Sequence, residues 1–172
     1  MRKEQKPDNI LLDLISDILT EDHETVAIAE SVTAGQLQTV FSLAENSMQF
    51  FQGGITTYNL EQKVKHLHVD PSHASKVNCV SEEVSAQMAK NVAELFQSDW
   101  GIAITGYASP VPEKNIHDLF ACYAIYYRGE EMVRRTVYVE NNTPQQVKLT
   151  YTNVVLNCFS VMLTNHSVGV CV

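Results

Sequence analysis

The stretch TVAIAESVTAG, residues 25–35, holds both parts of an α/β unit. Residues 25–29 are short, partly β-branched and bounded by polar side chains, which favours a buried strand. Glu30 and Ser31 follow at the end of that strand, and the pattern then becomes helical over residues 35–43. A strand that passes through a polar turn into a helix is typical of α/β proteins.

The alternation of strands and helices continues on both sides of this stretch. Helical spacing of apolar residues predicts amphipathic helices, and β-prone runs bounded by glycine or polar residues predict strands. We expect helices at residues 9–19, 59–67, 81–95 and 143–162, and strands at 51–58, 100–105, 119–127 and 132–140. The last two strands form a hairpin, so the sequence predicts an α/β layered sheet with one antiparallel portion.

Length and composition indicate one packed domain. The chain has 172 residues, of which 45% are hydrophobic and 19% charged, as in globular proteins that bury a core. We therefore expect a single domain over residues 1–172 with its core at about 9–165. The net charge of -8 argues against nucleic acid as a partner, because such binding depends on Lys and Arg. A small phosphorylated ligand stays open, since one lysine or helix N-terminus can bind it.

The cysteines and the apolar runs indicate a reducing compartment. The four cysteines show no CxxC spacing and are expected to be free thiols: Cys79, Cys122, Cys158 and Cys171. Residues 1–10 carry positive charge but are not followed by an apolar stretch of signal length. No run approaches the roughly 20 apolar residues of a membrane span. We expect a cytoplasmic protein that does not bind a membrane.

Ser31 has two interpretations. Ligands of α/β sheets bind beyond the carboxyl ends of strands, where Ser31 stands. There its hydroxyl would be exposed, and the N–H groups of residues 33–35 would face negative charge that develops nearby. The alternative is that Ser31 or Thr33 only caps the following helix, which is the commoner use of these residues. Position alone favours the cap.

A serine nucleophile needs a base, and Lys63 is the candidate. No GxSxG elbow and no Ser/His/Asp order is present. A lysine serves as a base when burial leaves it partly neutral. Lys63 lies one turn into the helix that follows Tyr58, where it is placed to point back toward the end of the strand. The alternative is a solvated surface lysine such as Lys65.

The remaining candidates have ordinary alternatives. Three histidines lie close together in the sequence: His66, His68 and His73. Their spacing does not place them on one face of a helix with a further ligand, so we expect no metal ion. Glu30 either orients a substrate amide or lies at the strand end. Lys114, in the polar loop 106–118, either contacts a phosphate or is solvated.

Four blocks of sequence carry a resemblance to a known family. AESVTAG, FFQGGITTYNLEQKVKHLHV, VSEEVSAQMA and ITGYASP occur in the order and spacing of the CinA carboxy-terminal domain family, the nicotinamide-nucleotide amidases. The chain resembles that family from Leu11 to Leu163. The resemblance implies a three-layer α/β/α sandwich with a mixed sheet. It also implies hydrolysis of nicotinamide mononucleotide to nicotinate mononucleotide and ammonia, a small-molecule substrate, no cofactor and a homodimer.

The resemblance also implies site residues. The catalytic serine of the family falls on Ser31, its tyrosine on Tyr58 and its lysine on Lys63. Lys63 would take the Ser31 proton, Tyr58 would help to relay it, and N–H groups after Ser31 would hold the oxyanion. The implied substrate-binding positions are Glu30, Thr33, Gly35, Gly54, Thr105 and Gly106. The match of all four blocks together favours a role for Ser31 as a nucleophile over a role as a helix cap.

The chain departs from the family pattern in several places. Where the family has ESCTGG, this chain has Val32 and Ala34, and where it has TGIAGP, this chain has Tyr107 and Ser109. IHDLF replaces a KPVG-type segment and ENN replaces a GDR-type stretch, so cations expected to hold a phosphate are missing there. Two alternatives therefore stay open: an amidase for an unphosphorylated amide, and a non-catalytic protein that binds a nucleotide-like ligand or a protein partner through loop 106–118. The amino-terminal domain often fused to this family is expected to be absent.

Overall fold

A mixed five-stranded sheet forms the centre of the molecule. The computed structural model describes residues 9–167, so Cys171 and residues 1–8 lie outside the described part. The strand order is β2-β1-β3-β4-β5. The strands are β1 (Val26–Glu30), β2 (Phe51–Thr56), β3 (Trp100–Gly106), β4 (Leu119–Tyr127) and β5 (Glu130–Val139). The first three are parallel, and β4 and β5 add the expected antiparallel hairpin.

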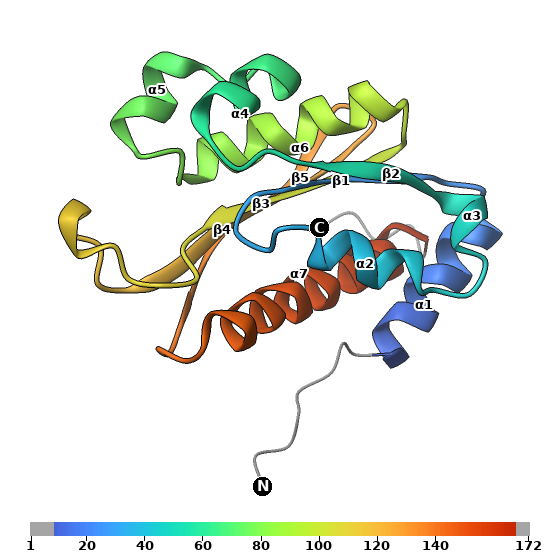
Figure 1. Cartoon of the computed structure of the whole chain (residues 1–172). Helices are drawn as coiled ribbons and strands as arrows, with labels where there is room; N and C mark the ends of the chain where they lie inside the picture. Colours follow the sequence, from blue (N-terminus) through green and yellow to red (C-terminus); the bar gives the residue numbers. More distant parts are fainter. Residues whose placement is uncertain (1–8, 168–172) are drawn as a thin grey trace, which may run out of the picture.

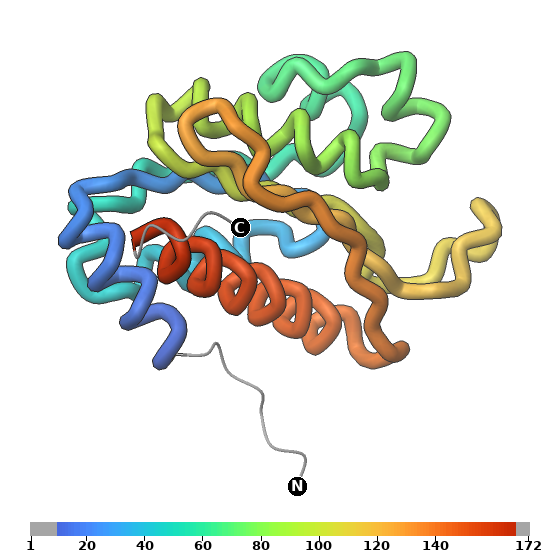
Figure 2. The backbone as a smooth tube through the Cα atoms, turned by 180° about the vertical axis from the view of Figure 1, so that it is seen from behind, coloured from blue at the N-terminus to red at the C-terminus, as the bar shows by residue number. Residues whose placement is uncertain are grey.

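Helices cover both faces of this sheet, which confirms the three-layer α/β/α prediction. Helices α4 (Leu60–Leu67), α5 (Pro71–Lys76) and α6 (Glu82–Phe96) lie on one face (Figure 1). Helices α1 (Asn9–Glu21), α2 (Gln36–Ser42) and α7 (Pro144–Ser167) lie on the other, and α3 (Ser47–Phe50) lies beside them. Figure 2 shows the same layers from behind, with the segment between β3 and β4 projecting past the sheet.

Local sequence signals set the starts of several helices. The side-chain oxygens of Asn59 and Ser81 accept the backbone N–H groups of Gln62 and Val84, as their N-cap positions predict. Thr143 opens α7 with a capping box to Gln146. These caps confirm three predicted helix starts.

The sequence did not predict every element. Helix α3 has four residues, and its N-cap, Asn46, stands at a positive φ without a side-chain hydrogen bond. Pro71 starts a short helix, for which Asp70 supplies the cap. Loop 106–118 contains a short 3-10 helix, Pro112–Lys114.

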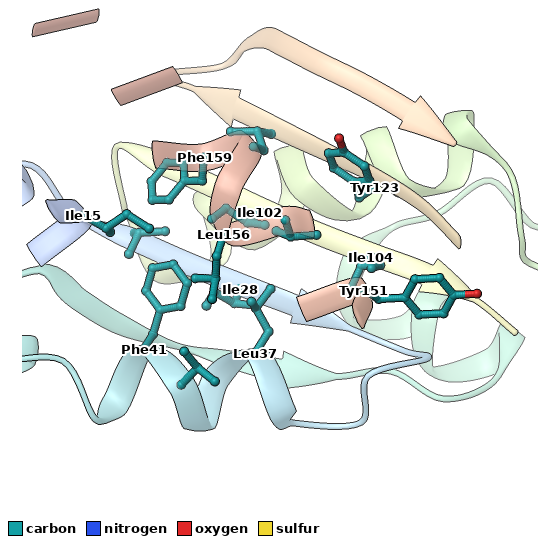
Figure 3. Packing of buried hydrophobic residues seen from close by; sticks show 14 of the residues in the cluster. Ile15, Ile28, Leu37, Phe41, Ile102, Ile104, Tyr123, Tyr151, Leu156 and Phe159 are labelled. Carbon is teal, nitrogen blue, oxygen red and sulfur yellow. The ribbon is translucent and has the colours of Figure 1, made fainter. Parts of the chain in front are cut away.

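The sheet separates two cores of buried hydrophobic residues. Between the sheet and helices α1, α2 and α7, buried residues from each element pack together, including Ile15, Ile28, Leu37, Phe41, Ile102, Leu156 and Phe159 (Figure 3). On the other face a smaller core forms around α6. Because β1 and β3 are buried on both faces, their carboxyl ends are held firmly against helices from both layers.

A buried carboxylate lies at the amino end of β3. Glu24 is 5% exposed and accepts hydrogen bonds from Trp100 Nε1 and Tyr127 Oη, each at 2.6 Å. His166, near the end of α7, has its Nε2 3.6 Å from Glu24 Oε1 and packs edge-on against the Trp100 ring. This cluster holds the last turns of α7 against the sheet.

Two further findings concern membrane-spanning helices and the cysteines. Within residues 9–167, no helix combines the length and the apolar character that crossing a membrane requires. Cys79, Cys122 and Cys158 are free thiols.

Candidate active site

Ser31 stands directly beyond β1, at the edge of the sheet where the parallel strands end. Its backbone N–H donates to the carbonyl of Ile104 in β3 at 3.0 Å, which holds the residue between two strand ends. The side chain is only 7% exposed, and Oγ accepts a hydrogen bond from Lys63 Nζ at 2.8 Å. Ser31 therefore does not cap the following helix.

Lys63 is buried and points back toward the sheet. It lies in the first turn of α4, and Nζ also donates to the carbonyl of Thr57 at 2.6 Å. The residue is 1% exposed, and this burial lowers the pKa of its ammonium to about 8, although the nearby Cys79 thiol acts in the opposite direction. At pH 7 about a tenth of such lysines are neutral. The neutral amine can accept the Ser31 proton while one N–H still donates to Thr57.

Glu30 caps the helix that follows the site. Its carboxylate is fully buried and accepts the backbone N–H groups of Gly35, Leu37 and Gln38 at 2.7 to 3.1 Å. A carboxylate at this place satisfies the free N–H groups of α2 and suits the positive end of its dipole. The structure thus turns the Glu30 carboxylate toward the start of α2, whereas the sequence left open whether Glu30 orients a substrate amide or lies at the strand end.

The turn between Ser31 and α2 leaves two backbone donors free. The N–H of Ala34 donates to the Ser31 carbonyl at 3.2 Å, and that of Gly35 to Glu30. Within residues 9–167, the N–H groups of Val32 and Thr33 donate to no protein group. Of the expected oxyanion donors, only Thr33 keeps a free N–H, and Val32 adds a second.

A cavity of about 660 Å³ opens beside the contact between Ser31 and Lys63. Five of the sequence-predicted site residues line it: Ser31, Tyr58, Lys63, Thr105 and Gly106. Thr105 is buried, and its hydroxyl donates to the Cys79 carbonyl at 2.9 Å. Tyr58 is 70% exposed, at the opening.

The other four predicted residues do not line this cavity: Glu30, Thr33, Gly35 and Gly54. Gly54 serves packing, because a Cβ there would lie 2.4 Å from the carbonyl oxygen of Ile28 and 2.8 Å from the Gln38 side chain. Gly35 stands at φ +94° and provides the N–H that Glu30 accepts. The Thr33 hydroxyl is buried and has no partner among the described residues.

Sequence reasoning did not single out several of the residues that line the cavity, and three of these come from two separate segments. Asn78 and Cys79 follow α5 at positive φ, and Lys148 lies in the second turn of α7. No local motif marks them, since they reach the cavity only through tertiary packing. The departures Tyr107 and Ser109 also line the cavity, and Ser109 is not at a positive φ, so its backbone does not require glycine.

The three histidines do not converge. His66 bonds the Gln62 side chain and His73 bonds Ser81 Oγ. Among the residues that the structure describes, no three His, Cys, Asp or Glu side chains gather as metal ligands.

Comparisons with known proteins show which family this chain belongs to. A family model described as the CinA C-terminal domain matches residues 8–163. A CinA-like protein of Rippkaea orientalis is 38% identical over 103 residues, 60% of this chain and 25% of that protein. A putative competence-damage inducible protein of Moorella thermoacetica is 37% identical over 133 residues, 77% of this chain and 32% of that protein. The chain thus spans about a quarter to a third of these relatives.

Solved structures agree with the fold. A competence or damage-inducible protein from Enterobacter asburiae superposes with a TM-score of 0.86 at 27% identity, covering 92% of this chain and 99% of that chain. A protein of the CinA superfamily from Escherichia coli gives a TM-score of 0.78 at 25% identity, covering 93% and 94%. The matched residues contain the whole sheet, Ser31 and Lys63, and the chain therefore belongs to the CinA C-terminal domain family.

Proposed function

We propose that this protein is an amidohydrolase that converts nicotinamide mononucleotide to nicotinate mononucleotide and ammonia. The observation that carries the proposal is the 2.8 Å contact between Ser31 Oγ and Lys63 Nζ, inside a cavity and with the Lys63 pKa lowered to about 8. A cavity of about 660 Å³ is of the size that takes a small molecule. The substrate itself comes from the family resemblance.

Acylation is the first half of the reaction. Neutral Lys63 takes the Ser31 proton as Oγ attacks the carboxamide carbon, and a tetrahedral intermediate forms. The free N–H groups of Val32 and Thr33 are the donors in this turn available to its oxyanion. The Lys63 ammonium then gives its proton to the departing nitrogen, so ammonia leaves and an ester to Ser31 remains.

Deacylation uses the same groups in reverse order. Neutral Lys63 takes a proton from a water molecule, and the oxygen of that water attacks the ester carbon. Collapse of the second tetrahedral intermediate breaks the bond to Ser31 Oγ, which regains its proton from Lys63. The products are unmodified protein and the carboxylic acid, which loses its remaining proton to solvent and becomes the carboxylate.

The direct test is release of ammonia from nicotinamide mononucleotide, with chromatography of the product. Ser31→Ala and Lys63→Met are expected to lower kcat by at least about a thousandfold, because each removes a group that the bond-making step requires. Ser75→Ala and Lys65→Met are matched controls: Ser75 also lines the cavity, and Lys65 lies on the same helix but is exposed. Full activity of Ser31→Ala on a confirmed substrate would refute the mechanism.

The exposed position of Tyr58 favours a second candidate function, in which the protein binds a nucleotide-like ligand without turnover. In the described part of the chain the Tyr58 hydroxyl has no hydrogen bond, so the relay to Lys63 is not assembled. An amidase predicts that Tyr58→Phe lowers kcat about 10- to 100-fold while the melting temperature stays constant. A rise in melting temperature with ligand but no ammonia from wild-type protein would support binding alone.

The proposal extends to assembly and location. We propose a homodimer in a reducing, cytoplasmic compartment, supported by the family resemblance and the free thiols. Light scattering of purified protein measures the assembly.

A further inference from the structure

Thr57 is a buried residue with an unpaired hydroxyl. The residue is 0% exposed, its backbone N–H donates to the Glu30 carbonyl at 2.8 Å, and its carbonyl accepts Lys63 Nζ at 2.6 Å. The hydroxyl has no hydrogen-bond partner among the described residues. Buried polar groups are nearly always paired, because leaving one unpaired costs free energy, so an unpaired hydroxyl next to the proposed base points to a function for it.

The position of Thr57 separates it from the other unpaired groups. Within residues 9–167, three more buried side-chain atoms have no partner: Thr20 Oγ1, Thr33 Oγ1 and Asn153 Oδ1. In the same part of the chain, none of these three residues forms a hydrogen bond with Lys63. By standard covalent geometry a threonine hydroxyl lies about 3 to 4 Å from its own carbonyl oxygen. Thr57 Oγ1 is therefore in the immediate surroundings of Lys63 Nζ.

The Lys63 ammonium has one donor more than the acceptors that it contacts. It carries three N–H groups, and in the described part of the chain two of them donate, one to Ser31 Oγ and one to the Thr57 carbonyl. No carboxylate supplies the third acceptor: among residues 9–167 no Asp or Glu lines the cavity, and both Glu30 oxygens accept backbone N–H groups at the start of α2. The other titratable side chains of the lining are Tyr58, Cys79, Tyr107, Lys114 and Lys148. Of these, only the Cys79 thiol acts on the Lys63 pKa, and its sulfur is a weak acceptor.

We propose that the Thr57 hydroxyl positions Lys63 by accepting its third N–H when the lysine takes the Ser31 proton. Rotation about the Cα–Cβ bond of Thr57 moves the oxygen between staggered positions and needs no change of backbone. Hydrogen bonds from an ammonium are about twice as strong as those from a neutral amine, so the hydroxyl stabilises the charged lysine that acylation produces. Thr57 is a positioning residue, since it acts on the substrate only through Lys63. Its part in catalysis rests on the proposed function, whereas the hydrogen bond to the ammonium does not.

Titration of Lys63 by NMR tests this hydrogen bond without a substrate. Protein with isotopically labelled lysine gives a titrating Cε signal for each lysine, and the signal that is lost in Lys63→Met belongs to Lys63. We expect Thr57→Val to move the midpoint of this signal down by about 0.5 to 1 pH unit, because the ammonium loses an acceptor, and Thr57→Ser to keep the wild-type midpoint. Thr20→Val is the matched control, since it removes another unpaired buried hydroxyl and should leave the midpoint unchanged.

Stability separates this role from a merely structural one. Removing an unpaired buried hydroxyl relieves a cost, so Thr57→Val and Thr20→Val should both keep or raise the melting temperature. Thr57→Ala serves the same comparison if the valine variant does not fold. An unchanged Lys63 midpoint in the folded variant overturns the inference, as does an equal shift in Thr20→Val.

Turnover gives a second readout. In Thr57→Val the plateau of kcat at high pH should fall about threefold to tenfold, and the rise of kcat/KM with pH should move to lower pH together with the Lys63 midpoint. Thr57→Ser should restore both. A lower kcat with an unchanged pH profile contradicts the positioning role. A shifted Lys63 midpoint in Thr57→Val, with no ammonia from wild-type protein, supports the hydrogen bond and refutes the proposed function.

Discussion

The Lys63 ammonium nitrogen lies 2.8 Å from Ser31 Oγ, although 32 positions separate the two residues in the sequence. The end of β1 carries the serine, and the first turn of α4 returns the lysine to it. Both side chains are buried, so the contact is held by the packing of the strand ends and not by flexible surface groups. The first two predictions follow from this pair.

Activity is expected to rise with pH. Because only neutral Lys63 accepts a proton, kcat/KM should follow a group with a pKa of about 8. The rate at pH 6 is then about 50-fold below that at pH 8, because the neutral fraction is about 1% at the lower pH and half at the higher. Ammonia release across pH 5.5 to 9 measures this. A flat or falling profile over that range would exclude Lys63 as the base.

Stability should rise with pH in a defined window. The Lys63 pKa is about 8 in the folded chain, whereas the ordinary value for a lysine in the unfolded chain is 10.5, so between these values the unfolded chain binds more protons. The free energy of unfolding therefore increases with pH there, by about 2 to 3 kcal/mol relative to Lys63→Met. Urea unfolding of both proteins at pH 7, 8.5 and 10 gives the difference. Parallel curves for the two proteins would contradict the prediction.

Glu30→Gln is expected to destabilise the fold by about 2 kcal/mol. The substitution replaces a carboxylate that accepts three N–H groups with an amide that has one acceptor oxygen. Activity should fall too, because the same turn presents Val32 and Thr33. The control is Glu61→Gln, an exposed acid in the first turn of α4, which should change stability by less than about 0.5 kcal/mol. Equal effects of the two substitutions would show that Glu30 is no special cap.

Ala34→Gly is expected to stabilise the protein. Ala34 stands at φ +53°, a left-handed conformation that costs a residue with a Cβ about 1 to 2 kcal/mol, and the greater backbone freedom of glycine offsets only part of this gain. We expect a net gain of about 0.5 to 1 kcal/mol by urea unfolding. Ala86→Gly, inside helix α6, should instead lose about 1 kcal/mol. A loss at both positions would mean that Ala34 is not strained.

Much of the fold could be predicted because its signals are local. The strand over residues 25–29, the caps Asn59, Ser81 and Thr143, and the hairpin each depend on neighbouring residues. Helix α3 escaped prediction because one turn without a side-chain cap leaves no periodic pattern.

The site could be predicted only in part. The position of Lys63 one turn after a cap suggested its direction, but nothing in the sequence told whether Glu30 faces the ligand or its own helix. Asn78, Cys79 and Lys148 come from separate segments and meet through packing, which single-sequence patterns do not report.

Trp100 is the chain's only tryptophan, and its surroundings give it a use as an optical probe. It is fully buried at the start of β3, bonded to Glu24 and in contact with Tyr127 and His166, whereas the cavity lies at the other end of that strand, beside Thr105 and Gly106. Its fluorescence therefore reports loss of the sheet and of the α7 anchor, and is insensitive to whether the cavity is filled. One emission signal can thus follow unfolding in the presence of ligand without correction for occupancy.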